Sequence, residues 1–304
     1  MAFWFPLALI TTIFWGGSDL FSKMGSDPRD KYSHLKMIVA VGGVMGIVGT
    51  VMLIQNFNEF DPMSIIRYLP VSALYIGSMM IGYIGLRYLM LSISSPICNA
   101  SGAVASLMCL AFLGQELVGM QFVAIALILT GTILLAVFDV KEENQARTFR
   151  GEVIEEKYKV GLLAVLIPFF YCIIDAIGIF ADAVVLDGDN PIVTEVEGAI
   201  AYNLTFLVCG IVAFIYVFVI KKQKISLKEE REKGFAALCE TAGQFFYIQA
   251  IARNAAASAP VISAYCVFSL IFSKLFLKEK LTKKQYMAVA VAITGIIIMG
   301  FFEK

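Results

Sequence analysis

The chain is poor in charge and lacks the residue patterns on which most enzymes depend. Of its 304 residues, only 16% are charged and one is histidine, while 59% are hydrophobic. Soluble proteins are nearer half apolar and about a quarter charged. The sequence has no Walker loop, no paired metal-binding motif, no nucleophile elbow and no polar stretch long enough for a nucleotide-binding domain. We therefore predict neither an enzyme nor an ATP-driven pump, and no cofactor or metal.

Paired cysteines and a cleavable leader are also missing. The six cysteines lie inside apolar blocks and none forms a CxxC pair, which favours small apolar packing residues over disulfides or metal ligands. The first apolar segment, from Ala2, has no basic stretch before it and no small-residue cleavage pattern after it. We expect it to be a retained helix.

Apolar blocks of about 20 residues, the length that a helix needs to cross a bilayer, fill most of the chain. They predict an all-α membrane protein with ten transmembrane helices, and the polar stretch 139–159 is the longest predicted loop. The ten predicted helices cover residues 3–25, 34–54, 65–88, 93–113, 119–138, 160–185, 193–220, 233–253, 257–277 and 283–302.

One part of the sequence repeats another. Residues 94–133 align with residues 258–297 at a constant shift of 164 positions and without a gap. Chance matching of apolar residues would not also align proline, glutamine and Thr-Gly, so we interpret the match as an internal duplication. The matched pairs include Pro96 with Pro260, Gln121 with Gln285, and Thr130-Gly131 with Thr294-Gly295.

Positive charge marks alternate loops. Lysine and arginine gather after the first, fifth, seventh and ninth predicted helices, and such loops face the cytoplasm. Both termini are therefore predicted to lie outside. Because each half has five helices, an odd number, the halves have opposite topology. We predict two inverted five-helix repeats, residues 1–138 and 160–304, joined by a cytoplasmic linker at 139–159.

These features resemble the drug/metabolite transporter (DMT) superfamily, in its EamA-like branch. The resemblance rests on the segment Phe14 to Ser18, the paired Ser-x-Pro helix starts, and the paired Thr-Gly. It covers essentially the whole chain, although Tyr171-Cys172 stands where the family often repeats Trp-Gly. The resemblance implies inverted repeats and alternating access to a central cavity, with amino acids, other metabolites, drugs or choline-like cations as substrates.

Carboxylates inside predicted helices are the first candidates for a site, because such residues are costly in a membrane. Asp19 and Asp175 occupy corresponding positions in the two halves. Lys23, one turn after Asp19, favours a structural ion pair there. Asp175 has no such neighbour, and we predict it to be a proton or cation site. Asp182 is expected to be a solvated helix end.

Glu240 is the other candidate proton site. Gln244 and Tyr247 follow it at the next turns of one helix face. The alternative is a residue near the cytoplasmic end that pairs with Lys233 or Lys274. At the predicted outer mouth, Glu195 and Glu197 can attract cations, but helix N-terminal charge explains Glu195 better.

Aromatic and amide residues complete the candidate site. An aromatic face beside a carboxylate suits an organic ammonium group, although packing or lipid-interface roles explain more than half of such residues. The further residues that we predict to line the site are Trp15, Tyr83, Tyr171, Tyr265 and Asn99.

The leading hypothesis is a monomeric, multi-pass secondary transporter of the cytoplasmic membrane. Its partners would be protons, the lipid bilayer and a small organic substrate, with a preference for a cationic or zwitterionic amine; no nucleic acid is expected. Two alternatives remain open at this point: a neutral amino-acid or metabolite facilitator without proton coupling, and a receptor or scaffold that transports nothing.

Overall fold

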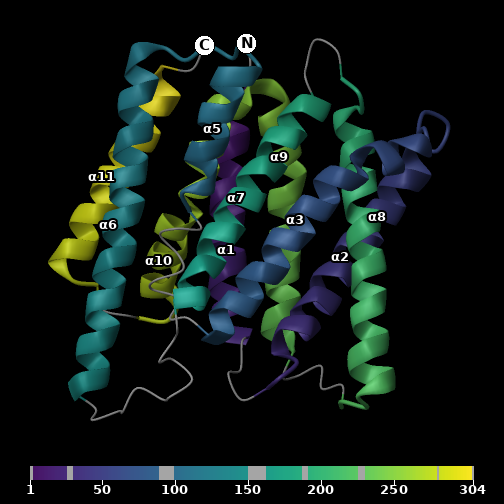
Figure 1. The fold of residues 1–304 in the computed structure, drawn as a ribbon, viewed down its shortest axis with the longest axis horizontal. Helices are drawn as coiled ribbons and strands as arrows, with labels where there is room; N and C mark the ends of the chain where they lie inside the picture. The colour runs from purple at the N-terminus through teal and green to yellow at the C-terminus, as the bar shows by residue number, and fades with distance from the viewer. Residues whose placement is uncertain are drawn as a thin grey trace.

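The computed structural model describes residues 3–25, 30–88, 99–149, 162–186, 191–224, 230–278 and 281–302. All regular elements in this part of the chain are helices, as predicted, and they run roughly parallel in one bundle (Figure 1). The α-helices are α1 (Trp4–Gly25), α2 (Ser33–Gln55), α3 (Met63–Tyr88), α5 (Ser101–Phe112), α6 (Gly119–Phe149), α7 (Leu162–Val185), α8 (Glu195–Phe214), α9 (Arg231–Ser263), α10 (Tyr265–Phe276) and α11 (Lys283–Phe301).

Several helices are suited to a bilayer. Five segments of the described residues are long and apolar enough to cross one, in agreement with a multi-pass membrane protein. They are Ser33–Gln55, Met63–Ile81, Glu195–Ile220, Arg231–Phe276 and Lys283–Phe301. The third of these joins α8 to a π-helical turn, η2 (Ile215–Ile220).

Two predicted boundaries were wrong. The first is the end of the predicted helix 119–138, because α6 continues through residues 139–149. That stretch is polar but rich in good helix formers, so helix outlasts the apolar block. The second is the predicted helix 257–277, which is divided: α9 ends at Ser263, and α10 starts after Ala264. The predicted break between residues 253 and 257 is present as a kink in α9 at Asn254. The Asn254 side chain accepts a hydrogen bond from the Ala257 N–H and so caps the helix beyond the kink.

The duplicated residues make the same local hydrogen bonds in both halves. Gln121 accepts a hydrogen bond from the Val118 N–H at the start of α6, and Gln285 accepts one from the Thr282 N–H at the start of α11. Each therefore satisfies a backbone donor at its helix N-terminus. In the same way, Thr130 and Thr294 each bond the carbonyl four residues earlier. The matching helix of the first half, α5, starts after Ala100, which aligns with Ala264; residues 89–98 lie outside the described part.

Helices of the first half pack on helices of the second half. α6 pairs with α11 at one edge of the bundle and α2 pairs with α8 at the other, while α1 and α9, and α3 and α7, pack between them (Figure 1). The two edge pairs cross at glycines. A Cβ atom on Gly42 would lie 2.6 Å from the Phe206 carbonyl oxygen, and one on Gly131 would lie 2.5 Å from the Ala292 nitrogen. Only glycine allows the backbones to approach this closely.

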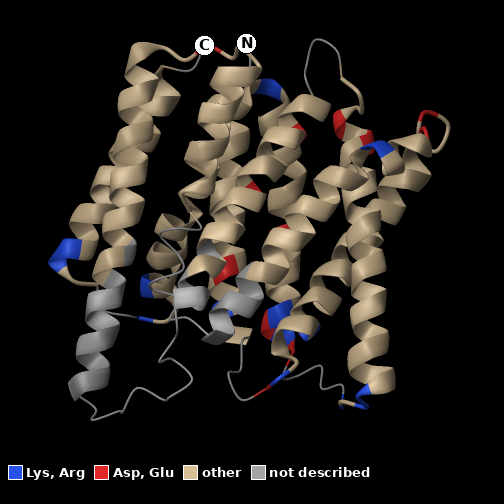
Figure 2. Cartoon of the chain, viewed as in Figure 1, with Lys and Arg blue, Asp and Glu red and all other residues tan. Residues whose placement is uncertain are grey.

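The two ends of the bundle differ in charge. Both termini lie at one end, as Figure 1 shows. Lysine and arginine gather toward the opposite end, where α1, α8 and α10 end and α2, α9 and α11 begin (Figure 2). This placement agrees with the alternation of charge along the sequence.

Candidate functional site

An aromatic cluster joins α1, α3, α9 and α10. The Trp15 indole stacks on the Tyr247 ring with 5.1 Å between centroids, and Tyr265 meets Trp15 edge-on at 6.3 Å. Tyr75 meets Tyr247 edge-on at 5.9 Å, and their hydroxyl groups are hydrogen-bonded to each other. Gly243 makes the stack possible, because a Cβ atom there would lie 2.4 Å from Trp15 Cδ1. Three of the predicted aromatic residues thus come together, and Tyr75 joins them.

Asp175 lies half-buried near the middle of α7 and contacts two helices of the first half. The Ser78 hydroxyl on α3 donates a hydrogen bond to Asp175 Oδ1 at 3.1 Å. Ser101, at the start of α5, also donates to this carboxylate. Tyr171 is half-buried one helical turn before Asp175 on α7. The two serine hydroxyl groups stabilise the carboxylate without neutralising its charge, so the negative charge remains available to attract a cation.

Asp19 and Glu240 form an acidic pair, where α1 packs on α9. Ser269 on α10 donates a hydrogen bond to Asp19 Oδ2 at 2.5 Å, and Ser18 donates one to Glu240. The two carboxylates lie close enough to repel each other. Lys23 acts on Asp19 electrostatically, as expected of residues one turn apart. A cation or a proton at this pair would relieve the repulsion.

The lysines that we considered as partners of Glu240 make other contacts. Lys233 Nζ lies 2.5 Å from Glu230 Oε2. Lys274 Nζ lies 4.5 Å from the centroid of the Tyr286 ring. Within the described part of the chain, no lysine or arginine forms an ion pair with Glu240 or Asp175.

Asp182 is buried, so the prediction of a solvated helix end was wrong. Its side chain has 0% exposure. The Tyr68 hydroxyl on α3 donates a hydrogen bond to Asp182 Oδ1 at 2.6 Å, across 114 residues of sequence. Helix α3 packs along α7 and covers the position that would otherwise face solvent. A weak signal existed in the sequence: Tyr68 and Tyr75 share one face of α3 at the seven-residue spacing that separates Asp175 from Asp182.

Two buried donors near the aromatic cluster lack acceptors. Among the described side chains, Gln244 Nε2 and Trp15 Nε1 are buried polar atoms without a hydrogen-bond partner. Gln244 is 4% exposed and follows Glu240 by one turn. Buried donors are normally satisfied, and those that are not are places where a ligand or water binds. A ligand with acceptor groups, such as a carboxylate, would supply the missing acceptors.

The remaining predicted site residues are Asn99 and Tyr83. Asn99 is buried at 4% exposure in the turn that precedes α5. Tyr83 belongs to α3, but its side chain lies outside the described residues. The structure therefore does not relate Tyr83 to the aromatic cluster.

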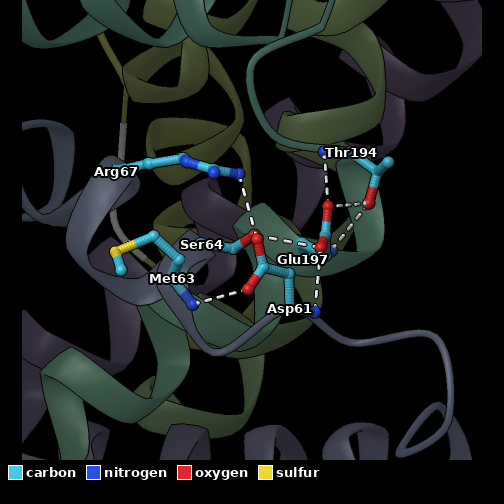
Figure 3. A network of polar contacts seen from close by, with 6 residues as sticks. All are labelled: Asp61, Met63, Ser64, Arg67, Thr194 and Glu197. Atoms are coloured by element: carbon cyan, nitrogen blue, oxygen red, sulfur yellow. Dashed lines mark hydrogen bonds and ion pairs between the residues drawn. The ribbon is translucent and has the colours of Figure 1, made fainter.

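A polar network connects the halves at the end of the bundle that holds the termini (Figure 3). Thr194 and Glu197 form a capping box at the start of α8. Glu197 Oε1 also accepts hydrogen bonds from the Asp61 N–H at 3.2 Å and from the Ser64 hydroxyl at 2.9 Å, before and at the start of α3. Arg67 completes the network through an ion pair with Asp61 at 3.1 Å. Glu197 thus has a structural role, as helix N-terminal charge predicts.

A network of ion pairs joins the halves at the opposite end. Lys36 Nζ lies 2.7 Å from Asp30 Oδ2 and 3.1 Å from Glu230 Oε1, so it bridges the loop after α1 to the start of α9. Partial burial alone raises the pKa of Asp30. The hydrogen bonds from Lys36 and from the Tyr32 N–H outweigh this effect and lower the pKa below its ordinary value of 3.8.

Carboxylates and aromatic rings from both halves therefore surround the contact of α1 with α9. This arrangement can bind an organic cation, exchange protons and accept an anionic group at its free donors. No group of three or more histidine, cysteine or acidic residues in the described part is placed to hold a metal ion.

The chain is similar to a known protein family in sequence and to solved structures in fold. The model of the EamA-like transporter family matches residues 193–301, which contain α8 to α11. The predicted resemblance to this family, and to the DMT superfamily that contains it, is confirmed over that part. Twenty-eight chains of solved structures match. One crystal structure superposes with a TM-score of 0.69 at 12% sequence identity, over 98% of this chain and 97% of the other, and shows the fold alone. No curated protein sequence matches.

Proposed function

We propose that the protein is a secondary active transporter that exchanges protons for a small organic amine by alternating access. The observation that carries the proposal is the set of intramembrane carboxylates beside the Trp15–Tyr247 stack, without a cationic partner for Asp175 or Glu240 among the described residues. Such carboxylates are costly unless they bind a proton or a cation during the working cycle. The family match at residues 193–301 supports transport of a small molecule.

The site favours a zwitterionic amine over a simple cation. Asp175 and Glu240 suit the ammonium group, and the Trp15 and Tyr247 rings add cation–π attraction of roughly 2 kcal/mol or more when desolvated. The free donors of Gln244 and Trp15 suit a carboxylate at the other end of the substrate. We expect a substrate with an ammonium group and a carboxylate to use both the acidic side chains and the free donors.

The pairing of helices supports inverted five-helix repeats. α1 packs on α9 and α10, while α7 packs on α3 and α5; α2 packs on α8, and α6 on α11. Each contact of the first half therefore has a counterpart in the second half, as a two-fold axis in the membrane plane requires. In such folds the substrate lies between the repeats, where the carboxylates are. We infer ten helices in all and place the termini outside the cytoplasmic membrane, because the basic end should face the cytoplasm.

In the proposed cycle, protons and substrate compete for the same oxygens. Asp175 or Glu240 holds a proton in one state and releases it when the ammonium group binds. The repeats then rock about the site and expose it to the other side. An exporter and an importer differ only in the direction of the gradients.

Ligand binding to the purified protein tests this competition. We expect a thermal-shift screen of amines, amino acids and lipid head groups to identify amines, since a ligand of the folded state raises apparent stability. Higher pH should strengthen the shift, because it removes the competing proton. Asp175→Asn or Glu240→Gln should weaken both the shift and its pH dependence, whereas Glu59→Gln, in an exposed turn, should leave them unchanged. Strong binding of neutral compounds alone, independent of pH, would refute the proposal.

A further inference from the structure

Asp182 belongs to a cluster that the proposed cycle does not use. Three helices enclose it: α7 carries Asp182, α3 carries Tyr68 and Tyr75, and α9 carries Tyr247. All four side chains are buried, with at most 8% exposure. Asp182 lies two turns beyond Asp175 on α7, about 10 Å closer to the end that holds the termini. The cluster thus lies to one side of Asp175 and Glu240.

One oxygen of Asp182 has no hydrogen bond of normal geometry. Oδ1 accepts the hydrogen bond from Tyr68, whereas Oδ2 is a buried atom that meets no donor at hydrogen-bonding geometry among the described residues, although the Tyr75 and Tyr247 hydroxyl groups lie beside the carboxyl group. The ionisable groups that face Asp182 are Tyr68 and Tyr75 on α3 and Tyr247 on α9. Tyr202 on α8 and Asp175 on α7 act in turn on these tyrosines. None of them supplies a positive charge. An ionised carboxylate in this position would bear a large desolvation penalty.

A proton on Oδ2 would account for both the oxygen without a hydrogen bond and the buried charge without a cation. It would remove the charge and turn the unpartnered oxygen into a hydrogen-bond donor. Acceptors are at hand, because the Tyr75 and Tyr247 hydroxyl groups lie beside the Asp182 carboxyl group and retain free lone pairs although they bond each other. The neutral acid would then connect α3, α7 and α9 in one hydrogen-bonded group.

We propose that Asp182 is a proton-binding site distinct from the substrate site, and that its proton keeps the parts of α3, α7 and α9 around it packed together. Loss of the proton would leave a buried charge without a cationic partner, which attracts water, so the three helices would separate there. Tyr247 links the two sites, because its hydroxyl belongs to this cluster while its ring stacks on Trp15. The role of this site in transport rests on the proposed function, but the protonation itself does not.

Infrared difference spectroscopy of the full-length protein in lipid nanodiscs detects this proton directly. We expect an acid-minus-alkaline spectrum to contain a C=O stretching band of the neutral Asp182 carboxylic acid, beside any bands from Asp175 and Glu240. Asp182→Asn should remove that band and leave the others, and Asp175→Asn should not remove it. Tyr68→Phe keeps the ring but removes the donor to Oδ1, so the band should move to higher frequency. Tyr216→Phe, on η2, is the matched control and should change nothing.

Hydrogen exchange gives the second readout. After correction for intrinsic rates, exchange in α3 and α7 around Asp182 should rise with pH, by up to about tenfold per pH unit if opening releases one proton. Asp182→Asn, which cannot ionise, should remove this rise. An Asp182→Asn spectrum that keeps every carboxylic-acid band of the wild type, a Tyr68→Phe spectrum equal to wild type, or an exchange rise around Asp182 that is the same in Asp182→Asn as in wild type would overturn the inference. These measurements need no substrate, so failure of the transport proposal would leave their outcome unaffected.

Discussion

The Tyr247 side chain contacts two groups of residues. Its ring forms the aromatic stack with Trp15, and its hydroxyl bonds Tyr75 beside Asp182. A substrate that displaces or presses on this ring would also disturb the tyrosine cluster. At the scale of single residues, this is the most direct physical link between substrate binding and the packing of α3 against α9.

Replacement of Trp15 tests whether the aromatic cluster binds ammonium groups. Trp15→Leu should weaken choline binding by about 30-fold, the equivalent of about 2 kcal/mol of cation–π attraction. Binding of dimethylbutanol, the uncharged isostere of choline, should change much less. Calorimetry on the purified protein measures both. Phe14→Leu is the matched control, since Phe14 stacks on Phe246 instead. Equal losses for choline and its isostere would mean that Trp15 only packs.

Sequence reasoning located candidate residues better than it assigned their surroundings. Trp15, Tyr247 and Tyr265 were predicted and come together, because polar or aromatic residues in a membrane helix tend to face the protein interior. Asp182 was assigned to solvent because only its distance from the helix end was visible. Its actual environment depends on Tyr68, which is 114 residues away, and no local pattern reports such a contact.

At the scale of elements, the duplicated sequence explains why certain residues repeat. Gln121 and Gln285 repeat because each caps a helix, and Gly131 and Gly295 repeat because α6 and α11 cross at both glycines. The extension of α6 to Phe149 was missed, since a hydropathy block ends where the apolar residues end and not where the helix does. The division after Ser263 was missed because nothing in the local sequence distinguishes it from a continuous apolar helix.

Two adjacent glycines offer a matched test of the contact between α2 and α8. Gly42→Ala should destabilise the protein by about 1–3 kcal/mol, because the new methyl group would meet the Phe206 carbonyl and the Gly210 backbone. Gly43 has open space around it, so Gly43→Ala should be neutral or stabilising by up to about 1 kcal/mol. Unfolding of both variants in detergent compares them. Similar stabilities would argue against this helix crossing.

At the scale of the whole molecule, polar contacts join the two halves at both ends of the bundle. Glu197 bonds the start of α3 at the end that holds the termini, and Lys36 bridges Asp30 and Glu230 at the basic end. Alternating access requires one of these networks to open while the other holds. The conformation in the structure has both networks formed, and the acidic and aromatic site lies between them.

The orientation of the bundle in the membrane is a separate prediction. A reporter enzyme that is active only outside the cytoplasm should be active when it is fused after Lys304. The same reporter inserted after Lys222, in the basic loop after η2, should be inactive, because lysine-rich loops remain in the cytoplasm. A cytoplasmic reading at Lys304 would reverse the proposed orientation.

Exchange across a membrane tests the central claim most directly. The protein is reconstituted into liposomes, a pH gradient is imposed, and uptake of a labelled amine found in the ligand screen is measured together with the internal pH. We predict uptake against the amine gradient that consumes the pH gradient, and its loss in Asp175→Asn or Glu240→Gln but not in Glu59→Gln. Amine flux without any dependence on the pH gradient, or binding without flux, would contradict the account.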